Sequence, residues 1–503
     1  MDFIQHLELG FLTALTFQNL FYCFVGVLVG TLIGVLPGIG PVAAIAMLIP
    51  LTYGLAPTTA LIMLAGIYYG AQYGGSTTSI LVNLPGESSS VVTCLDGYAM
   101  ARQGRAGQAL MIAALGSFFA GCISTLILAA FAPWLADLAL EFGSVEYFSL
   151  MLLGLVSAVI LASGSIIKAI AMIIMGLIFG LFGTDINSGV MRFTFNIPEL
   201  SDGIGFVVVA MGLFGFSEIL LNLEDKGKRE LVATRVESYW LTKTDLKESF
   251  PAVIRGTFLG SILGILPGGG GMLASFGSYS LEKKIAKNPK MFGKGAIQGV
   301  AGPESANNAG AQTSFIPMLV LGIPPNAVMA LMIGAMTIHN IQPGPQVLNS
   351  NPELFWGLIA SMWIGNLMLV ILNMPLIGIW IKLLLIPYWL LYPAILMFAC
   401  IGIYSLNNTT FDILMAVPFA FLGYIFAKLE CEPAPFLLGF ILGPMMEEHF
   451  RRALLLSRGD PSVFFTSALS FILLMLAFVL LVSVLVLPAI RRKREDIFEE
   501  GEG

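Results

Sequence analysis

Long apolar runs separated by short polar stretches dominate the chain. A helix that crosses a bilayer needs about 20 apolar residues, and runs near that length predict about twelve spans. Six lie in the first half of the chain, at residues 17–36, 57–73, 108–131, 145–163, 166–183 and 203–221. Six lie in the second half, at residues 251–267, 314–336, 354–374, 388–406, 411–427 and 462–487. The pattern predicts an all-α polytopic membrane protein.

Three shorter apolar pieces lie between these runs, at residues 41–51, 272–280 and 433–446. They are too short to cross a bilayer alone. Short hydrophobic segments in corresponding places of two halves are typical of re-entrant or broken helices in transporters. We therefore expect broken helices in both halves.

One motif occurs twice, 230 positions apart. The first copy is Gly30-Thr-Leu-Ile-Gly-Val-Leu-Pro-Gly-Ile-Gly40, and the second is Gly260-Ser-Ile-Leu-Gly-Ile-Leu-Pro-Gly-Gly-Gly270. Each copy is followed by a polar run and then a proline turn, with Pro85 in the first half and Pro324 in the second. A duplicated pair of interrupted apolar segments predicts a secondary transporter.

The composition excludes a soluble enzyme. The chain is 57% hydrophobic and 11% charged, whereas soluble domains carry roughly 25% charged residues. The sequence contains no P-loop, no HExxH and no GxSxG motif, and its five cysteines show no CxxC spacing. We therefore expect a lipid-embedded protein that is not an enzyme, without cofactor or nucleic-acid partner, and with no metal other than a transported Na⁺.

The distribution of basic residues predicts the orientation, because Lys and Arg gather on the cytoplasmic side. None precedes Arg102, so we expect a periplasmic N-terminus. The 222–250 linker and the tail at Arg491–Arg494 are rich in Lys and Arg and should be cytoplasmic. The two copies are then inverted in topology, although three arginines leave the topology of 428–460 unresolved.

This organisation divides the chain into four parts. We expect a first transmembrane repeat at residues 1–221 and a cytoplasmic linker at 222–250. A second repeat should follow at 251–446, and a final helix with a basic tail at 447–503.

The two Pro-Gly breaks and the polar runs are the candidate binding site. A helix break frees backbone amides that suit a carboxylate, while carbonyl and hydroxyl oxygens suit Na⁺. The predicted substrate-binding residues are Gly38, Gly40, Thr78, Ser79, Asn83, Pro85, Gly86, Gly268, Asn307, Asn308, Thr313, Ser314, Pro324 and Asn326. The predicted ion-coupling residues are Gly38, Ser76, Gly268 and Glu304. The alternative is that these residues serve helix packing and interhelical hydrogen bonding.

Glu304 is a rare carboxylate beside an apolar run. A carboxylate within the membrane is a functional candidate by default. The sequence Pro303-Glu304 would equally suit the first turn of a helix, where Glu304 would only cap the helix start. Glu87 offers a similar but weaker signal.

Several long motifs resemble one known family, the large membrane subunit of tripartite tricarboxylate transporters (the TctA family). The similar runs are Gly34–Pro41, Leu64–Ser76, Leu95–Gly107, Gly302–Asn308 and Ile338–Pro345. The resemblance extends from about residue 17 to about residue 446. It implies a subunit of the bacterial inner membrane that works with a small membrane subunit and a periplasmic solute-binding protein.

The resemblance also implies import of citrate or another small organic carboxylate by symport with Na⁺ or H⁺. Analogy to other carboxylate carriers suggests an elevator-like motion. The chain departs from the family pattern at Glu87-Ser88-Ser89, Gln312–Ser314 and Pro325-Asn326. These departures favour a ligand other than citrate. The alternatives are an intramembrane enzyme using Glu304 or a serine, and a passive anion channel.

Overall fold

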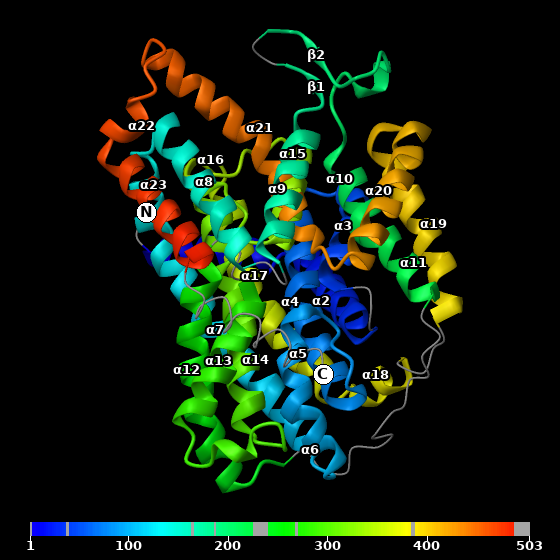
Figure 1. Cartoon of the computed structure of the whole chain (residues 1–503). Coiled ribbons are helices and arrows are strands. Elements are labelled where there is room, and N and C mark those ends of the chain that lie inside the picture. The colour runs from blue at the N-terminus through cyan, green and yellow to red at the C-terminus, as the bar shows by residue number, and fades with distance from the viewer. Residues whose placement is uncertain are drawn as a thin grey trace.

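The computed structural model describes residues 3–36, 40–161, 165–185, 188–224, 240–266, 270–383 and 388–486. This part of the chain is almost entirely helical (Figure 1). Its one small sheet pairs β1 (Gly183–Thr184) with β2 (Met191–Arg192) in antiparallel register, Gly183 opposite Arg192. The predicted all-α polytopic fold is therefore confirmed.

The first half contains α1 (Phe3–Ala14), α2 (Phe17–Val35), α3 (Gly40–Thr52), α4 (Pro57–Val82), α5 (Val91–Thr93), α6 (Ala99–Arg102), α7 (Ala106–Ala139), α8 (Ser144–Leu161), α9 (Ile166–Gly180), α10 (Phe206–Ala210) and α11 (Ser217–Glu224). The second half contains α12 (Lys243–Ile265), α13 (Gly270–Ile285), α14 (Gln298–Thr313), α15 (Ala327–Ile338), α16 (Val347–Ser350), α17 (Pro352–Asn373), α18 (Ile377–Leu383), α19 (Tyr388–Asn407), α20 (Thr410–Lys428), α21 (Pro433–Leu456), α22 (Val463–Thr466) and α23 (Ala468–Val486). Tighter or wider turns form η1 (Ser88–Ser90), η2 (Cys94–Tyr98), η3 (Pro198–Leu200), η4 (Met211–Phe216), η5 (Pro289–Met291) and η6 (Pro317–Leu321).

Four of the described helices, α2, α7, α17 and α20, have the length and apolar composition needed to cross a bilayer. Several shorter apolar helices accompany them, among them α3, α9 and α15. Helix α12 begins inside the stretch assigned to the linker, and α21 runs through the boundary placed at residue 446.

The sequence duplication extends to how the helices pack. Three glycines spaced by four residues on α2 lie against the backbone of α4, and three on α12 lie against the backbone of α14, so closely that a Cβ atom at any of them would collide. The contacts pair Gly26 with Met63, Gly30 with Ile67 and Gly34 with Ala71, then Gly256 with Gly302, Gly260 with Ala306 and Gly264 with Gly310. Small residues at this spacing allow close helix approach in membranes. The two halves therefore contain the same helix pair.

Each half also contains the same two interruptions. The first falls between α2 and α3 and between α12 and α13. Helix α3 begins at Gly40 with φ +61°, and α13 begins at Gly270 with φ +48°. Both values favour glycine. The predicted ligands Gly38 and Gly268 fall within 37–39 and 267–269, outside the described residues.

The second interruption ends a helix in the left-handed conformation. Asn83 ends α4 with φ 59°, and Gly322 ends η6 with φ 69°. A proline follows two residues later in each half. The prediction of one helix over 314–336 is therefore wrong, because the left-handed turn at Gly322 and the missing N–H groups of the two prolines stop it.

The prediction of a re-entrant or broken helix at 433–446 is also wrong. These residues belong to α21, a continuous helix of 24 residues. Its charged second half is held by ion pairs. Arg451 Nη1 lies 3.0 Å from Asp185 Oδ2, and Arg451 Nη2 lies 2.6 Å from Glu447 Oε1. Arg451, one of the three arginines that left the topology of 428–460 unresolved, is therefore paired with two acidic side chains.

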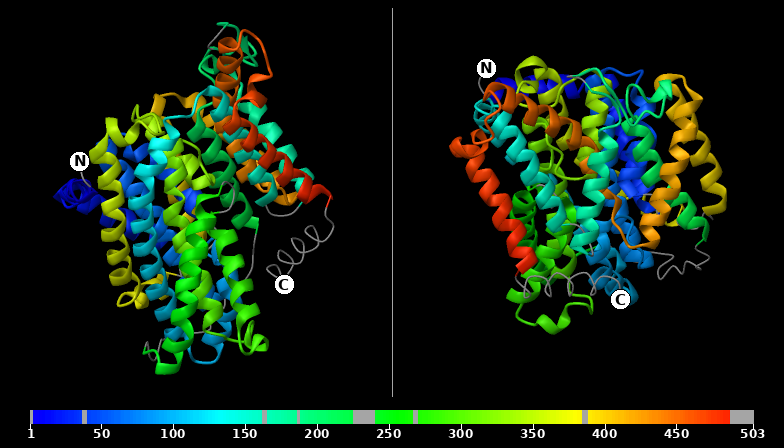
Figure 2. Two further views of the ribbon diagram at one scale, coloured as in Figure 1. Left: turned by 90° about the vertical axis from the view of Figure 1, so that its left-hand side faces the viewer. Right: turned by 45° about the horizontal axis from the view of Figure 1, so that its top comes forward.

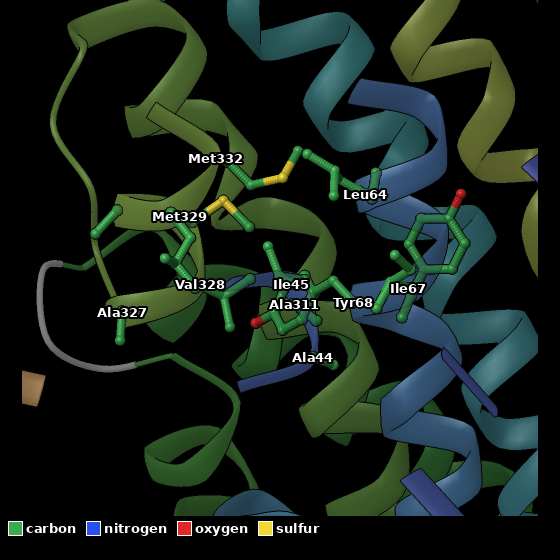
Figure 3. Close-up of a cluster of buried hydrophobic side chains, with 14 of the residues drawn as sticks. Ala44, Ile45, Leu64, Ile67, Tyr68, Ala311, Ala327, Val328, Met329 and Met332 are labelled. Atoms are coloured by element: carbon green, nitrogen blue, oxygen red, sulfur yellow. The ribbon is translucent and has the colours of Figure 1, made fainter. Parts of the chain in front are cut away.

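The broken segments of the two halves share one core. Figure 3 shows Ile45 of α3, Tyr68 of α4 and Met329 of α15 within one buried apolar cluster. Helices α8, α9 and α21 contribute to the same core and pack together with α23, and α11, α19 and α20 pack with η4 (Figure 2). This arrangement places the interruptions of both halves inside the protein.

Candidate functional site

The interruptions of the two halves line a common cavity of about 500 Å³. One wall consists of the broken segments and of α4. It includes Gly40, Pro41, Val42, Ala43, Tyr68, Gln72, Pro85, Gly86, Glu87, Ser89, Gly270, Gly271, Met272, Leu273, Phe276, Asn326, Ala327 and Val328. The opposite wall consists of Ala158 on α8, Phe214 on η4, Glu218 on α11, and Glu432, Pro433, Ala434, Pro435 and Leu438 at α21. The cavity therefore lies between two sets of elements that also touch each other, α3 against η4 and α15 against α21.

Three helices of the interrupted segments begin at this cavity. The lining includes Gly40 at the start of α3, Gly270 at the start of α13 and Ala327 at the start of α15. The first turn of a helix carries N–H groups without partners within the helix and a partial positive charge. Three such ends around one cavity form a place where a small anion can bind without Arg or Lys.

The charged side chains of the lining are acidic. Glu87, Glu218 and Glu432 line the cavity, and none of the described lining residues is Lys, Arg or His. Anionic groups this close to a bound carboxylate disfavour it unless a cation or proton binds as well. The lining therefore combines helix starts that suit an anion with three acidic side chains.

Glu87 connects the two halves of the chain. Asn307 Nδ2 on α14 donates to Glu87 Oε1 at 3.0 Å, and Ser89 Oγ donates to the same oxygen at 2.5 Å. Ser89 Oγ also lies 3.1 Å from Gln72 Oε1. Every member of this group is at least nine-tenths buried. The Oδ1 atom of Asn307 has no partner in the described structure.

Glu87 and Asn326 occupy equivalent places in the two halves. Each follows the left-handed residue and the proline, and each caps the next helix in extended backbone, with φ −153° at Glu87 and φ −154° at Asn326. Asn326 Oδ1 accepts the backbone N–H of Met329 at 3.0 Å. The cavity therefore has approximate internal symmetry, with a carboxylate on one side and an amide on the other.

Glu304 lies in the middle of α14. The helix begins at Gln298, so the interpretation of Pro303-Glu304 as a helix start is wrong. Thr93 Oγ1 donates to Glu304 Oε1, and Ser76 Oγ lies 2.5 Å from Glu304 Oε2. The side chain is buried, and it forms no ion pair within the described part of the chain. The structure thus brings together two of the predicted ion-coupling residues, Ser76 and Glu304.

Four predicted substrate ligands line the cavity, namely Gly40, Pro85, Gly86 and Asn326. Gly86 packs so closely against the backbone of Gly34 and Gly75 that a side chain would collide. The turn at Pro85-Gly86 is therefore pressed against the helix pair.

The other predicted ligands among the described residues are not part of the lining, and most of them bond to nearby groups. Thr78 Oγ1 donates to the carbonyl of Val35 at 2.9 Å, and Asn308 Nδ2 donates to Ser117 Oγ at 2.7 Å. Thr313 and Ser314 donate to carbonyls of their own helix, those of Ala309 and Ala311. Ser79 is fully buried on α4, Pro324 follows the break, and Asn83 is exposed at the end of α4. Their role as ligands stays a prediction.

Several lining residues were not predicted. Tyr68 and Gln72 belong to the run Leu64–Ser76 used for the family resemblance, which was the available signal. Glu218 and Glu432 do not belong to any motif recognised in the sequence. They lie more than 200 positions apart, and only the fold brings them to one cavity. Thr93 was likewise missed as a partner of Glu304.

Comparisons with known proteins agree with this architecture. A model of the tripartite tricarboxylate transporter TctA family matches residues 20–438. The chain is 60% identical over 502 residues to an uncharacterized 52.8 kDa protein in the TAR-I ttuC' 3' region of Agrobacterium vitis, with 100% of both chains covered. It is also 60% identical over 243 residues to an uncharacterized protein in the TAR-II ttuC' 3' region of Agrobacterium vitis, covering 48% of this chain and 100% of that protein. No solved structure matches. The chain belongs to the tripartite tricarboxylate transporter TctA family.

Proposed function

We propose that this membrane protein is the translocation subunit of a secondary active transporter that imports tricarboxylates or related small organic carboxylates, driven by a Na⁺ or H⁺ gradient. Membership of the TctA family supplies the class of transport system. The observation that carries the proposal is the cavity of about 500 Å³ at the interruptions of both halves, lined by three helix starts.

The size and chemistry of the cavity support a small carboxylate as substrate. Pockets for small molecules have volumes of roughly 300–1,000 Å³. Backbone N–H groups at Gly40, Gly270 and Ala327 would bind the carboxylate groups, and the hydroxyl of Tyr68 and the amide of Gln72 would bind further oxygens. The acidic lining supports symport, because a cation or proton must offset the added negative charge.

The division of the lining supports alternating access. One wall belongs to the interrupted segments and the other to α8, η4, α11 and α21. We infer that the two repeats are inverted and that an elevator-like motion of one wall against the other exposes the cavity to each side in turn. The N-terminus is then periplasmic and the C-terminus cytoplasmic, in the inner membrane. A periplasmic solute-binding protein delivers the substrate, and a small membrane subunit completes the complex.

Uptake in proteoliposomes tests the proposal. The complex of this chain, its small subunit and its binding protein is reconstituted, and radiolabelled citrate and other di- and tricarboxylates are supplied with an inward Na⁺ or H⁺ gradient. We expect accumulation above the external concentration that requires both the gradient and the binding protein. Equilibration without either would identify a passive channel, and release of a changed product would identify an enzyme.

A further inference from the structure

The side chain of Ser76 contacts two hydrogen-bond acceptors, one of which is Glu304. Ser76 Oγ lies 2.5 Å from Glu304 Oε2 and 3.0 Å from the backbone carbonyl oxygen of Gln72. A hydroxyl group has one hydrogen to donate, and a peptide carbonyl oxygen only accepts. Each contact is a two-centre hydrogen bond with its own hydrogen when Glu304 carries a proton on Oε2 and donates it to Ser76, while Ser76 donates to Gln72.

The surroundings of the carboxyl group agree with this count. Glu304 is 1% exposed. An ionised carboxylate at this depth would need a basic partner or many donors. The remaining oxygen, Oε1, accepts the hydroxyl of Thr93. A proton held on Glu304 fits these two contacts.

The other charged and titratable groups around Glu304 do not supply a counter-charge. Within electrostatic reach lie Tyr73 on α4, Glu87 before η1 and Cys94 on η2. On α12 and α13, Arg255 is committed to Glu282 through two hydrogen bonds, at 2.7 and 2.6 Å.

Two further neighbours are already partnered. Asp96 on η2 accepts the N–H groups of Gly295 and Ala296 and the hydroxyl of Tyr279. Helix α7 presents the neutral Ser117 to Asn308, which lies one turn after Glu304 on α14. No described group therefore neutralises an ionised Glu304.

Ser76, which contacts Glu304, lines one cavity directly and meets the lining of another through Gln72. On one side Gln72, whose carbonyl faces Ser76, lines the 500 Å³ cavity and meets Glu87 through Ser89. On the other side Ser76 lines a second cavity of about 20 Å³ with Ser117 and Asn373. A water molecule needs about 10–15 Å³ and several polar partners. Asn373 Oδ1 has no partner within the described structure, so it is available to accept a hydrogen bond from a water molecule in this cavity.

We propose that the coupling ion is a proton and that Glu304 carries it, held between Ser76 and Thr93. This inference rests on the proposed function and names its ion and its site. In each cycle the Glu304 carboxylate takes up one proton from water on the outer side, moves as a neutral acid together with the bound substrate, and releases the proton to water on the inner side.

Infrared difference spectroscopy tests the protonation without any transport. The complete complex is titrated with acid and base, and the carboxylic acid C=O band is compared between wild type, Glu304→Gln and Ser76→Ala. We expect a wild-type band at neutral pH that is lost in Glu304→Gln and shifted in frequency in Ser76→Ala. Should Glu304→Gln fail to assemble, the Ser76→Ala shift still decides. A wild-type complex without the band, or a band unchanged in both variants, would overturn the proposal.

Transport assays test the coupling. Glutamine keeps a donor toward Ser76 but cannot release a proton, so Glu304→Gln should lose accumulation driven by a pH gradient and keep exchange of internal for external substrate. The matched control is Glu146→Gln, a carboxylate on α8 that also meets a serine hydroxyl at 2.5 Å, that of Ser467. Wild-type accumulation by Glu304→Gln, or loss of exchange as well, would overturn the role of Glu304. Failure of the wild type to transport any carboxylate would contradict the proposed function, while the infrared result would still stand.

Discussion

At the scale of single residues, equivalent positions in the two halves separate backbone roles from chemical ones. Positions 83 and 322 both adopt the left-handed conformation, one with Asn and one with Gly. Positions 87 and 326 both cap the next helix, one with Glu and one with Asn. The two halves share the backbone conformation at these positions. They differ in the side chains, which can therefore contact the substrate or the ion in one half without a counterpart in the other.

Asn83 is the residue at which these roles can be told apart. If it supports only the left-handed turn, as Gly322 does, then Asn83→Gly should retain wild-type uptake. Asn83→Ala should lower the stability by about 1–2 kcal/mol, because a Cβ atom without a compensating polar group disfavours this conformation. Uptake and thermal unfolding of both variants are measured at equal protein levels. Loss of uptake in the stable glycine variant would restore Asn83 as a ligand.

At the scale of elements, the glycine contacts between α12 and α14 repeat those between α2 and α4. The close approach places the polar face of α14, with Glu304 and Asn307, against α4 and η1. A substitution at one of these glycines would change the distance between the helices. It would therefore displace Glu304 and Asn307 although the glycine contacts neither substrate nor ion.

Gly260 and Gly277 make a matched pair for testing this spacing. A Cβ atom at Gly260 would collide with the backbone of Ala306, whereas one at Gly277 would lie 3.5 Å from the Leu263 side chain in ordinary contact. Gly260→Ala should lower the stability by about 1–3 kcal/mol through overpacking. Gly277→Ala should be neutral or slightly stabilising, because alanine favours the helix. Equal melting temperatures for the two variants would show that the helices separate freely.

At the scale of the whole molecule, the sequence predicted what depends on local pattern. The all-α membrane fold followed from the length of the apolar runs, and the paired interruptions followed from Pro37, Pro267 and their surroundings. The helix predicted over 314–336 was wrong because the span was assigned by length and apolar composition, although the proline turn at Pro324 lies inside it, after the left-handed Gly322. Proline near a helix start and proline inside a helix also look alike in sequence, which misplaced Glu304.

The site was predictable only on the wall built by the repeats. Gly40, Pro85, Gly86 and Asn326 lie in or beside duplicated motifs, and all line the cavity. The opposite wall, with Glu218 and Glu432, depends on how α11 and α21 pack. The apolar residues of α11 and α21 that are buried by this packing do not differ in type from those of other membrane helices. Their sequence therefore does not identify the helices they pack against.

The separation of the two walls leads to a prediction about access from either side of the membrane. Cys431 lies one residue before Glu432, which caps α21 and lines the cavity opposite the interrupted segments. Its thiol is partly exposed and makes only a weak contact at 3.7 Å, with the carbonyl of Leu429. A motion of one wall past the other should change how easily a reagent reaches this sulfur.

The measurement uses a bulky, membrane-impermeant maleimide on reconstituted complex, with Cys431→Ser as the control that reports labelling of the other four cysteines. We expect the labelling rate of Cys431 from one side to change when substrate and an ion gradient are supplied together, and labelling to inhibit uptake in the wild type but not in the serine variant. Substrate alone should have a smaller effect, because a carboxylate without its cation binds poorly to an acidic cavity. A labelling rate that is the same under all conditions would argue against motion between the walls and for a fixed pore.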